Sequence, residues 1–132
     1  MSRIEVLMKK RALLAEDHPG TIEVMQQELE ILGFEVVVAQ NGLEAVEKAV
    51  AETPDVIVMD MLMPKMDGFQ AASSIRQNPK TKNIPILAAT ALARPGDREK
   101  CLESGCDGYI AKPFTHKQLG AAIDRLFEVQ SN

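Results

Sequence analysis

Five short apolar runs, each separated from the next by a segment with helical spacing, constrain the fold of this chain more than any other feature. They cover residues 11–16, 34–39, 55–59, 84–89 and 108–111. The third run is apolar at every position after Asp55, which is typical of a strand buried on both faces of a parallel sheet. Parallel strands need long crossovers, and these are right-handed. The pattern therefore predicts an α/β fold: a doubly wound, five-stranded parallel sheet with five helices.

Caps and breakers predict where the helices begin and end. Ile22, Met25, Leu29 and Leu32 recur at helical spacing. We expect this first helix to stop at Gly33, and the later helices to be bounded as follows: a helix over 43–52 capped by Asn41, a helix over 69–77, a helix with Pro95 in its first turn that ends at Ser104 before Gly105, and a last helix capped by Thr115.

A chain of 132 residues is long enough for one domain with one sizeable core. We predict an N-terminal extension over residues 1–8, a single domain over 9–129 and a tail over 130–132. No apolar run approaches the ~18 residues of a membrane helix, and the start lacks the apolar core of a signal peptide. The sequence thus predicts a cytoplasmic protein with no membrane contact.

The net charge argues against a nucleic-acid partner, and the cysteine spacing argues against a disulfide or a metal site. The net charge of -4, without a cluster of Lys and Arg, argues against nucleic acid as a direct partner. Cys101 and Cys106 do not have CxxC spacing, and no matching His/Cys pair follows them. We interpret them as two reduced structural thiols.

Polar or charged side chains stand where four of the five predicted strands end: Glu16 with Asp17, Asp60, Thr90 and Lys112. In doubly wound sheets the carboxyl ends of the strands form the ligand-binding edge. Three carboxylates at one edge repel each other unless a cation lies among them, and all-oxygen ligands suit Mg²⁺. The ammonium and the hydroxyl group resemble parts of a phosphoryl-transfer site, in which a carboxylate such as Asp60 acts as nucleophile.

Four motifs in order resemble the receiver domains of two-component response regulators, the CheY-like family: LLAED at 13–17, VIVMDMLMPKMDG at 56–68, PILAATALA at 85–93 and GYIAKPF at 108–114. The resemblance implies a flavodoxin-like strand order 2-1-3-4-5. It also implies a role for each site residue: Asp60 as phosphoacceptor, Asp17 as a direct Mg²⁺ ligand, Glu16 as a ligand through water, the Leu62 backbone carbonyl as a further ligand, Thr90 and Lys112 as contacts to the phosphoryl group, Tyr109 as the switch aromatic, and a cis bond between Lys112 and Pro113.

The same resemblance implies the partners. A histidine kinase or histidine phosphotransfer protein would donate the phosphoryl group. Thr90 and Tyr109 would then reshape the face formed by the fourth helix, fifth strand and fifth helix, where a downstream protein docks. Such a chain catalyses only its own phosphorylation and dephosphorylation and is otherwise not an enzyme. It is expected to be a monomer or a phosphorylation-dependent dimer.

Three other functions are compatible with parts of the sequence. A flavin-binding module shares the fold but needs a hydroxyl- and glycine-rich loop after the first strand, where this chain has Glu16-Asp17-His18-Pro19. A phosphatase of the haloacid-dehalogenase type needs a second Asp two residues after its nucleophile, where this chain has Leu62. A phosphorylation-independent, receiver-like scaffold usually lacks one of the site residues, and all of them are present here.

Some positions depart from the receiver pattern. Ala15 stands where a bulkier aliphatic residue is usual, which predicts slightly looser packing beside the acidic pair. His18 follows that pair, and we interpret it as a helix-entry residue that points to solvent rather than as a metal ligand. His116 is expected to lie on the surface at the start of the last helix.

Overall fold

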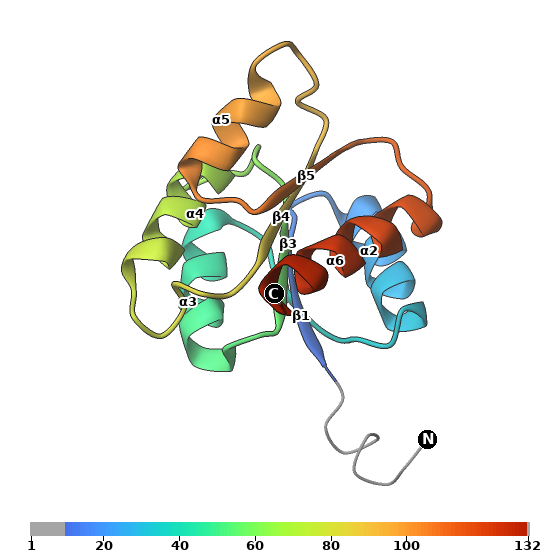
Figure 1. The fold of residues 1–132 in the computed structure, drawn as a ribbon, viewed down its shortest axis with the longest axis horizontal. Coiled ribbons are helices and arrows are strands. Elements are labelled where there is room, and N and C mark those ends of the chain that lie inside the picture. The colour runs from blue at the N-terminus through green and yellow to red at the C-terminus, as the bar shows by residue number, and fades with distance from the viewer. Residues whose placement is uncertain (1–9, 132) are drawn as a thin grey trace, which may run out of the picture.

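The computed structural model describes residues 10–131. The predicted extension over residues 1–8 therefore lies outside the described residues. The described residues form the predicted sheet, in which all strands are parallel and lie in the order β2-β1-β3-β4-β5 (Figure 1). The strands are β1 (Arg11–Ala15), β2 (Glu35–Ala39), β3 (Val56–Met59), β4 (Ile86–Thr90) and β5 (Gly108–Ala111). The fold class and the strand order predicted from the sequence are both confirmed.

Helices cover both faces of the sheet (Figure 1). One face carries α2 (Pro19–Ile31) and α6 (His116–Ser131); the other carries α3 (Gly42–Glu52), α4 (Gly68–Gln77) and α5 (Asp97–Ser104). Strands β3 and β4 are buried at every position. Their apolar side chains belong to two clusters, one beneath each layer of helices. This burial explains why the central runs are continuously apolar rather than alternating.

Most of the predicted helix ends are confirmed. The side chain of Asn41 accepts a hydrogen bond from the backbone N–H of Glu44 at 2.8 Å, and Thr115 Oγ1 accepts one from the N–H of Gln118 at 3.1 Å. Such bonds satisfy backbone donors that the first turn of a helix leaves free. Gly105 follows α5 with a φ of 121°, which suits a glycine.

The prediction that Pro95 lies in the first turn of α5 is wrong. Gly96 follows it with a φ of 90°, so the chain turns there and the helix begins at Asp97. The carboxylate of Asp97 reaches back and accepts a hydrogen bond from the N–H of Arg94 at 2.8 Å. A left-handed glycine thus separates the proline from the helix, and a local side-chain bond fixes the turn.

Both cysteines are free and buried, as predicted for structural thiols. They belong to the cluster beneath α3, α4 and α5. Burial raises the pKa of the Cys106 thiol to about 12, and burial also raises the pKa of Cys101. Because the thiolate is the reactive form, neither side chain is a good nucleophile at neutral pH.

Two glycines hold the loop between β3 and α4 close to the rest of the fold. A Cβ on Gly42 would lie 2.0 Å from the carbonyl oxygen of Met66, and a Cβ on Gly68 would lie 2.5 Å from the carbonyl oxygen of Asp60. Both neighbours are backbone atoms, which do not move aside as a flexible side chain does. The absence of side chains at these two positions therefore sets how closely the loop approaches α3 and the end of β3.

Gly42→Ala is accordingly expected to destabilise the protein by about 2 kcal/mol, because the methyl group overlaps backbone and forces the loop outward. Gly20→Ala is the matched control: it also lies in the first turn of a helix, but its nearest contact is the His18 ring at 3.3 Å. That change should be neutral or slightly stabilising. Urea unfolding of both variants measures the difference, and equal stabilities would show that the loop adapts freely.

Candidate functional site

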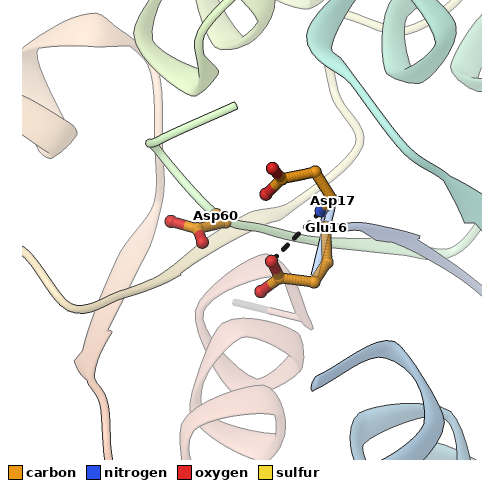
Figure 2. A group of neighbouring side chains, drawn as sticks. All are labelled: Glu16, Asp17 and Asp60. Carbon is orange, nitrogen blue, oxygen red and sulfur yellow. Dashed lines mark hydrogen bonds between the residues drawn. The ribbon is translucent and has the colours of Figure 1, made fainter. Parts of the chain in front are cut away.

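Three carboxylates meet at the carboxyl edge of the sheet. Glu16 and Asp17 follow β1, Asp60 follows the neighbouring strand β3, and Figure 2 shows the three side chains grouped there. One oxygen from each lies within 4.8 Å of the others. Glu16 is buried, the side chain of Asp60 is only 11% exposed and Asp17 is exposed, so the cluster opens to solvent on the side of Asp17.

A single ammonium group bridges two of these carboxylates. Lys112 follows β5, and its Nζ donates to Glu16 Oε1 at 2.5 Å and to Asp60 Oδ2 at 3.1 Å. Burial alone would lower the pKa of Lys112, but the hydrogen bond to Glu16 and the charges on Asp60 and Glu16 outweigh it and raise the pKa. The lysine therefore stays charged at neutral pH. The bond that follows it, Lys112–Pro113, is cis as predicted.

Protein groups occupy both oxygens of Glu16. While Oε1 accepts from Lys112, Oε2 accepts from the backbone N–H of Asp17 at 3.1 Å and of His18 at 3.2 Å. The Glu16 carboxylate is thus fixed in place, and the exposed Asp17 offers the most accessible oxygens of the three carboxylates. The indirect role predicted for Glu16 stays a prediction.

The donor set suits a divalent cation. Three carboxylates outnumber the one ammonium, which leaves excess negative charge at a solvent-accessible edge. Hard oxygen ligands and room for water are what Mg²⁺ prefers. The backbone N–H of Leu62 donates to Asp60 Oδ1 at 3.1 Å, so the residue after β3 is held against the acceptor. The predicted use of the Leu62 carbonyl as a ligand stays a prediction.

Thr90 lies at the end of β4, beside Lys112. The backbone N–H of Lys112 donates to the carbonyl of Thr90 at 2.9 Å, and the threonine is completely buried. Thr90 Oγ1 accepts from the backbone N–H of Leu92 at 3.3 Å, while the hydroxyl group of Tyr109 donates to the carbonyl of Leu92. The backbone of Leu92 therefore links the two predicted switch residues. No sequence signal marks this link, because any residue type provides these backbone atoms.

The ring of Tyr109 is half-buried and packs against the apolar cluster beneath α3, α4 and α5. Burial raises the pKa of its hydroxyl group, and so does the nearby charge of Asp97. In this structure the hydroxyl group of the half-buried side chain is held by the carbonyl of Leu92.

The two histidines lie as expected. His18 is exposed and serves as the N-cap of α2, where its Nδ1 accepts from the backbone N–H of Thr21 at 3.3 Å. His116 is exposed at the first position of α6. Neither imidazole belongs to the carboxylate cluster found among the described residues.

Comparison with known proteins decides the family. The family described as the response regulator receiver domain matches residues 12–124. The chain belongs to this family. The receiver domain is 37% identical over 120 residues to a probable transcriptional regulator, ycf27, of Guillardia theta, covering 91% of this chain and 46% of that protein. It is 32% identical over 108 residues to the polar-differentiation response regulator DivK of Brucella anthropi, covering 82% of this chain and 88% of DivK.

A solved structure supports the same assignment. The receiver domain of the sensor histidine kinase PA1611 from Pseudomonas aeruginosa PAO1 superposes with a TM-score of 0.85 at 37% identity, covering 91% of this chain and 98% of that one. That protein was crystallised with a magnesium ion coordinated in its active-site cleft. The receiver domain described here spans about half the length of several curated relatives, such as 46% of ycf27. Among residues 10–131, no helix is long and apolar enough to cross a membrane.

Proposed function

We propose that this receiver domain accepts a phosphoryl group on Asp60 in a Mg²⁺-dependent reaction. The observation that carries the proposal is the position of Asp60: its carboxylate lies beside Glu16 and Asp17 and is hydrogen-bonded to Lys112 at 3.1 Å. A phosphoryl group on Asp60 would carry negative charge. A cation bound by the carboxylates and the ammonium group of Lys112 would both neutralise that charge. The PA1611 receiver, at 37% identity, holds a magnesium ion in its active-site cleft, which supports the proposal.

In the proposed reaction, an oxygen of Asp60 forms a bond to phosphorus while the bond from phosphorus to the donor breaks. The donor atom leaves with the electron pair, and Asp60 becomes an acyl phosphate. Lys112 neutralises charge on the phosphoryl oxygens, and the hydroxyl group of Thr90 donates to one of them. Asp17, Asp60 and the Leu62 carbonyl would hold Mg²⁺ directly, with Glu16 acting through water. When bound, this ion neutralises the phosphoryl oxygens and orients them.

Receiver domains of response regulators interact with histidine kinases, so a phosphohistidine of a kinase or of a histidine phosphotransfer protein is the proposed donor. The catalysis is limited to the domain's own phosphorylation and dephosphorylation. A cytoplasmic location and the lack of direct nucleic-acid contact, both suggested by composition, stay predictions.

The test uses acetyl phosphate, a small donor that needs no partner surface. Incubation with Mg²⁺ should add one phosphoryl group to the intact mass, and hydroxylamine should remove it because it cleaves acyl phosphates. Chelation of the metal should prevent labelling. Equal labelling with and without Mg²⁺, or a label that resists hydroxylamine, would contradict the proposal.

Output is proposed to pass through the face formed by α5, β5 and α6, which either a downstream protein or a second copy of the domain would cover. The path starts at Thr90, whose Oγ1 is hydrogen-bonded to the backbone of Leu92, and continues to Tyr109, which is hydrogen-bonded to the same residue. A phosphoryl group that draws the threonine hydroxyl toward Asp60 competes with the first of these bonds. Movement of Leu92 would then change the position of the Tyr109 ring.

The expected result is a set of amide chemical-shift changes that extends beyond the metal site when beryllofluoride and Mg²⁺ are added. The changes should cluster at residues 90–98 and 108–117. Mg²⁺ alone is the control, because it binds the carboxylates without mimicking the acyl phosphate. If the changes stay among residues next to Asp60, nothing is transmitted to the proposed output face.

A further inference from the structure

The loop between β4 and α5 is held at two places. The first is Leu92, whose backbone N–H donates to Thr90 Oγ1 at 3.3 Å and whose carbonyl accepts from the hydroxyl group of Tyr109. The second is a tight turn over residues 94–97. A single residue separates Leu92 from this turn, so a shift of the turn moves the carbonyl that Tyr109 binds.

Asp97 closes that turn with two hydrogen bonds. Its backbone N–H donates to the carbonyl of Arg94 at 3.0 Å, and its carboxylate accepts from the N–H of Arg94 at 2.8 Å. Pro95 and Gly96, the latter with a φ of 90°, occupy the central positions, which is the residue pattern of a type II turn. The carboxylate thus adds to the turn a hydrogen bond that an apolar side chain at position 97 could not make.

The side chain of Asp97 is buried although it begins a short surface helix. It is 10% exposed, whereas the Arg94 side chain, whose Nε lies 3.4 Å from the carboxylate, is 80% exposed. An ion pair with so exposed a partner contributes little to stability. A buried carboxylate is costly unless hydrogen bonds compensate for the lost water. The bond to the backbone N–H of Arg94 is therefore the main interaction that holds this carboxylate in place.

The same carboxylate lies near the ring of Tyr109. Burial raises the pKa of the tyrosine hydroxyl group, and so do Cys101 and the charge of Asp97. Tyr109 is the only tyrosine of the chain, and the chain has no tryptophan. The fluorescence of this one ring therefore reports on the position of the loop that Asp97 closes.

We propose that Asp97 is a positioning residue of the switch, because the turn that it closes holds the backbone of Leu92 in place between the two switch residues. A phosphoryl group that draws the hydroxyl group of Thr90 toward Asp60 competes with the bond from Leu92, and the closed turn opposes the movement of the loop. Asp97 thus sets how readily phosphorylation changes the output face. The inference rests on the proposed function, since the phosphoryl group on Asp60 drives the movement.

Three variants separate the hydrogen bond of Asp97 from its charge. Asp97→Ala removes both, whereas Asp97→Asn keeps an oxygen that accepts from the N–H of Arg94 and removes only the charge. Asn78→Ala is the matched control, because its side chain accepts from the backbone N–H of Lys80 at 2.9 Å in the turn after α4. The first measurement is quenching of Tyr109 fluorescence by acrylamide. The second is the concentration of beryllofluoride, with Mg²⁺, that half-saturates the amide chemical-shift changes of the loop.

Asp97→Ala should make the ring of Tyr109 more accessible to acrylamide, because the loop that covers it is released. It should also lower the half-saturating concentration of beryllofluoride ~5-fold, since the turn no longer opposes the movement. Asp97→Asn should stay close to the wild type in both measurements because its turn keeps the hydrogen bond. Asn78→Ala should leave both unchanged, although it loses a bond of the same kind.

A further variant opens the same turn without altering Asp97. An added Cβ at Gly96 would meet nothing within 4 Å, so Gly96→Ala acts only through the φ of 90°, which an alanine rarely adopts. It should shift both measurements in the same direction as Asp97→Ala. Thermal unfolding of every variant measures whether the fold is retained, and Gly96→Ala carries the test if Asp97→Ala does not fold.

Unchanged quenching and unchanged beryllofluoride binding in Gly96→Ala and Asp97→Ala would overturn the inference. So would a change in quenching without a change in binding, because Asp97 would then stabilise the loop without affecting the switch. An effect of Asp97→Asn as large as that of Asp97→Ala would also contradict it, since the charge rather than the closed turn would be responsible. A wild type that acetyl phosphate fails to label would refute the proposed function and the role of Asp97 in the switch, whereas quenching, which needs no phosphoryl group, would still show whether Asp97 positions the loop.

Discussion

Asp60→Asn is expected to abolish labelling by acetyl phosphate and to leave the fold intact. An amide oxygen is a far weaker nucleophile than a carboxylate and cannot form the acyl phosphate. The substitution keeps the shape of the side chain, and its oxygen still accepts the hydrogen bond that the N–H of Leu62 now donates at 3.1 Å. Lys112 keeps its second partner, Glu16. Intact-mass analysis after incubation with donor and Mg²⁺ measures the loss.

The matched control for this variant is Asp124→Asn, which makes the same chemical change on an exposed position of α6. It should be labelled at the wild-type rate. Thermal unfolding of both variants separates loss of the acceptor from loss of the fold. If Asp60→Asn acquires a hydroxylamine-sensitive phosphoryl group as fast as the wild type, another carboxylate is the acceptor, and Asp17 becomes the first candidate.

The sequence predicts the sheet and the acidic cluster for related physical reasons. Strand β3 is buried at all of its positions, so its run of apolar residues had to be unbroken, and the first charge after it had to lie at the edge. Parallel strands bring their carboxyl ends to one edge of the sheet. Asp60, Asp17 and Lys112 therefore come together although they are far apart along the chain, and strand ends alone are enough to place them.

Features that depend on backbone atoms or on contacts between distant segments were not predictable in this way. The sequence predicts that α5 begins at Pro95, but Gly96 has a left-handed φ and separates the proline from the helix. The presence of a proline gives no information about the φ of the residue that follows it. In sequence, Glu28 is an ordinary charged residue on the outer face of a helix. It lies in a groove wall only because Pro113 and Phe114, in a loop more than eighty residues later, lie opposite α2.

Lys112→Met is expected to lower the free energy of unfolding by about 3–5 kcal/mol when no divalent cation is added, because it leaves a buried charge without its partner. Glu16 is only 2% exposed, and Lys112 is hydrogen-bonded to one of its oxygens. Methionine keeps most of the aliphatic length of lysine, so the loss reflects the charge rather than a cavity. Lys117→Met, an exposed position in the first turn of α6, should change stability by less than about 0.5 kcal/mol.

A double-mutant cycle with Glu16→Gln isolates the pair. If the loss comes from the unpaired carboxylate, Glu16→Gln should cost much less in the Lys112→Met background than in the wild type, and urea unfolding at neutral pH gives both values. Mg²⁺ should stabilise Lys112→Met more than it stabilises the wild type, since a cation among the carboxylates replaces the missing ammonium. Additive effects in the cycle, together with equal stabilisation by Mg²⁺, would mean that the lysine does not balance the charge of this cluster.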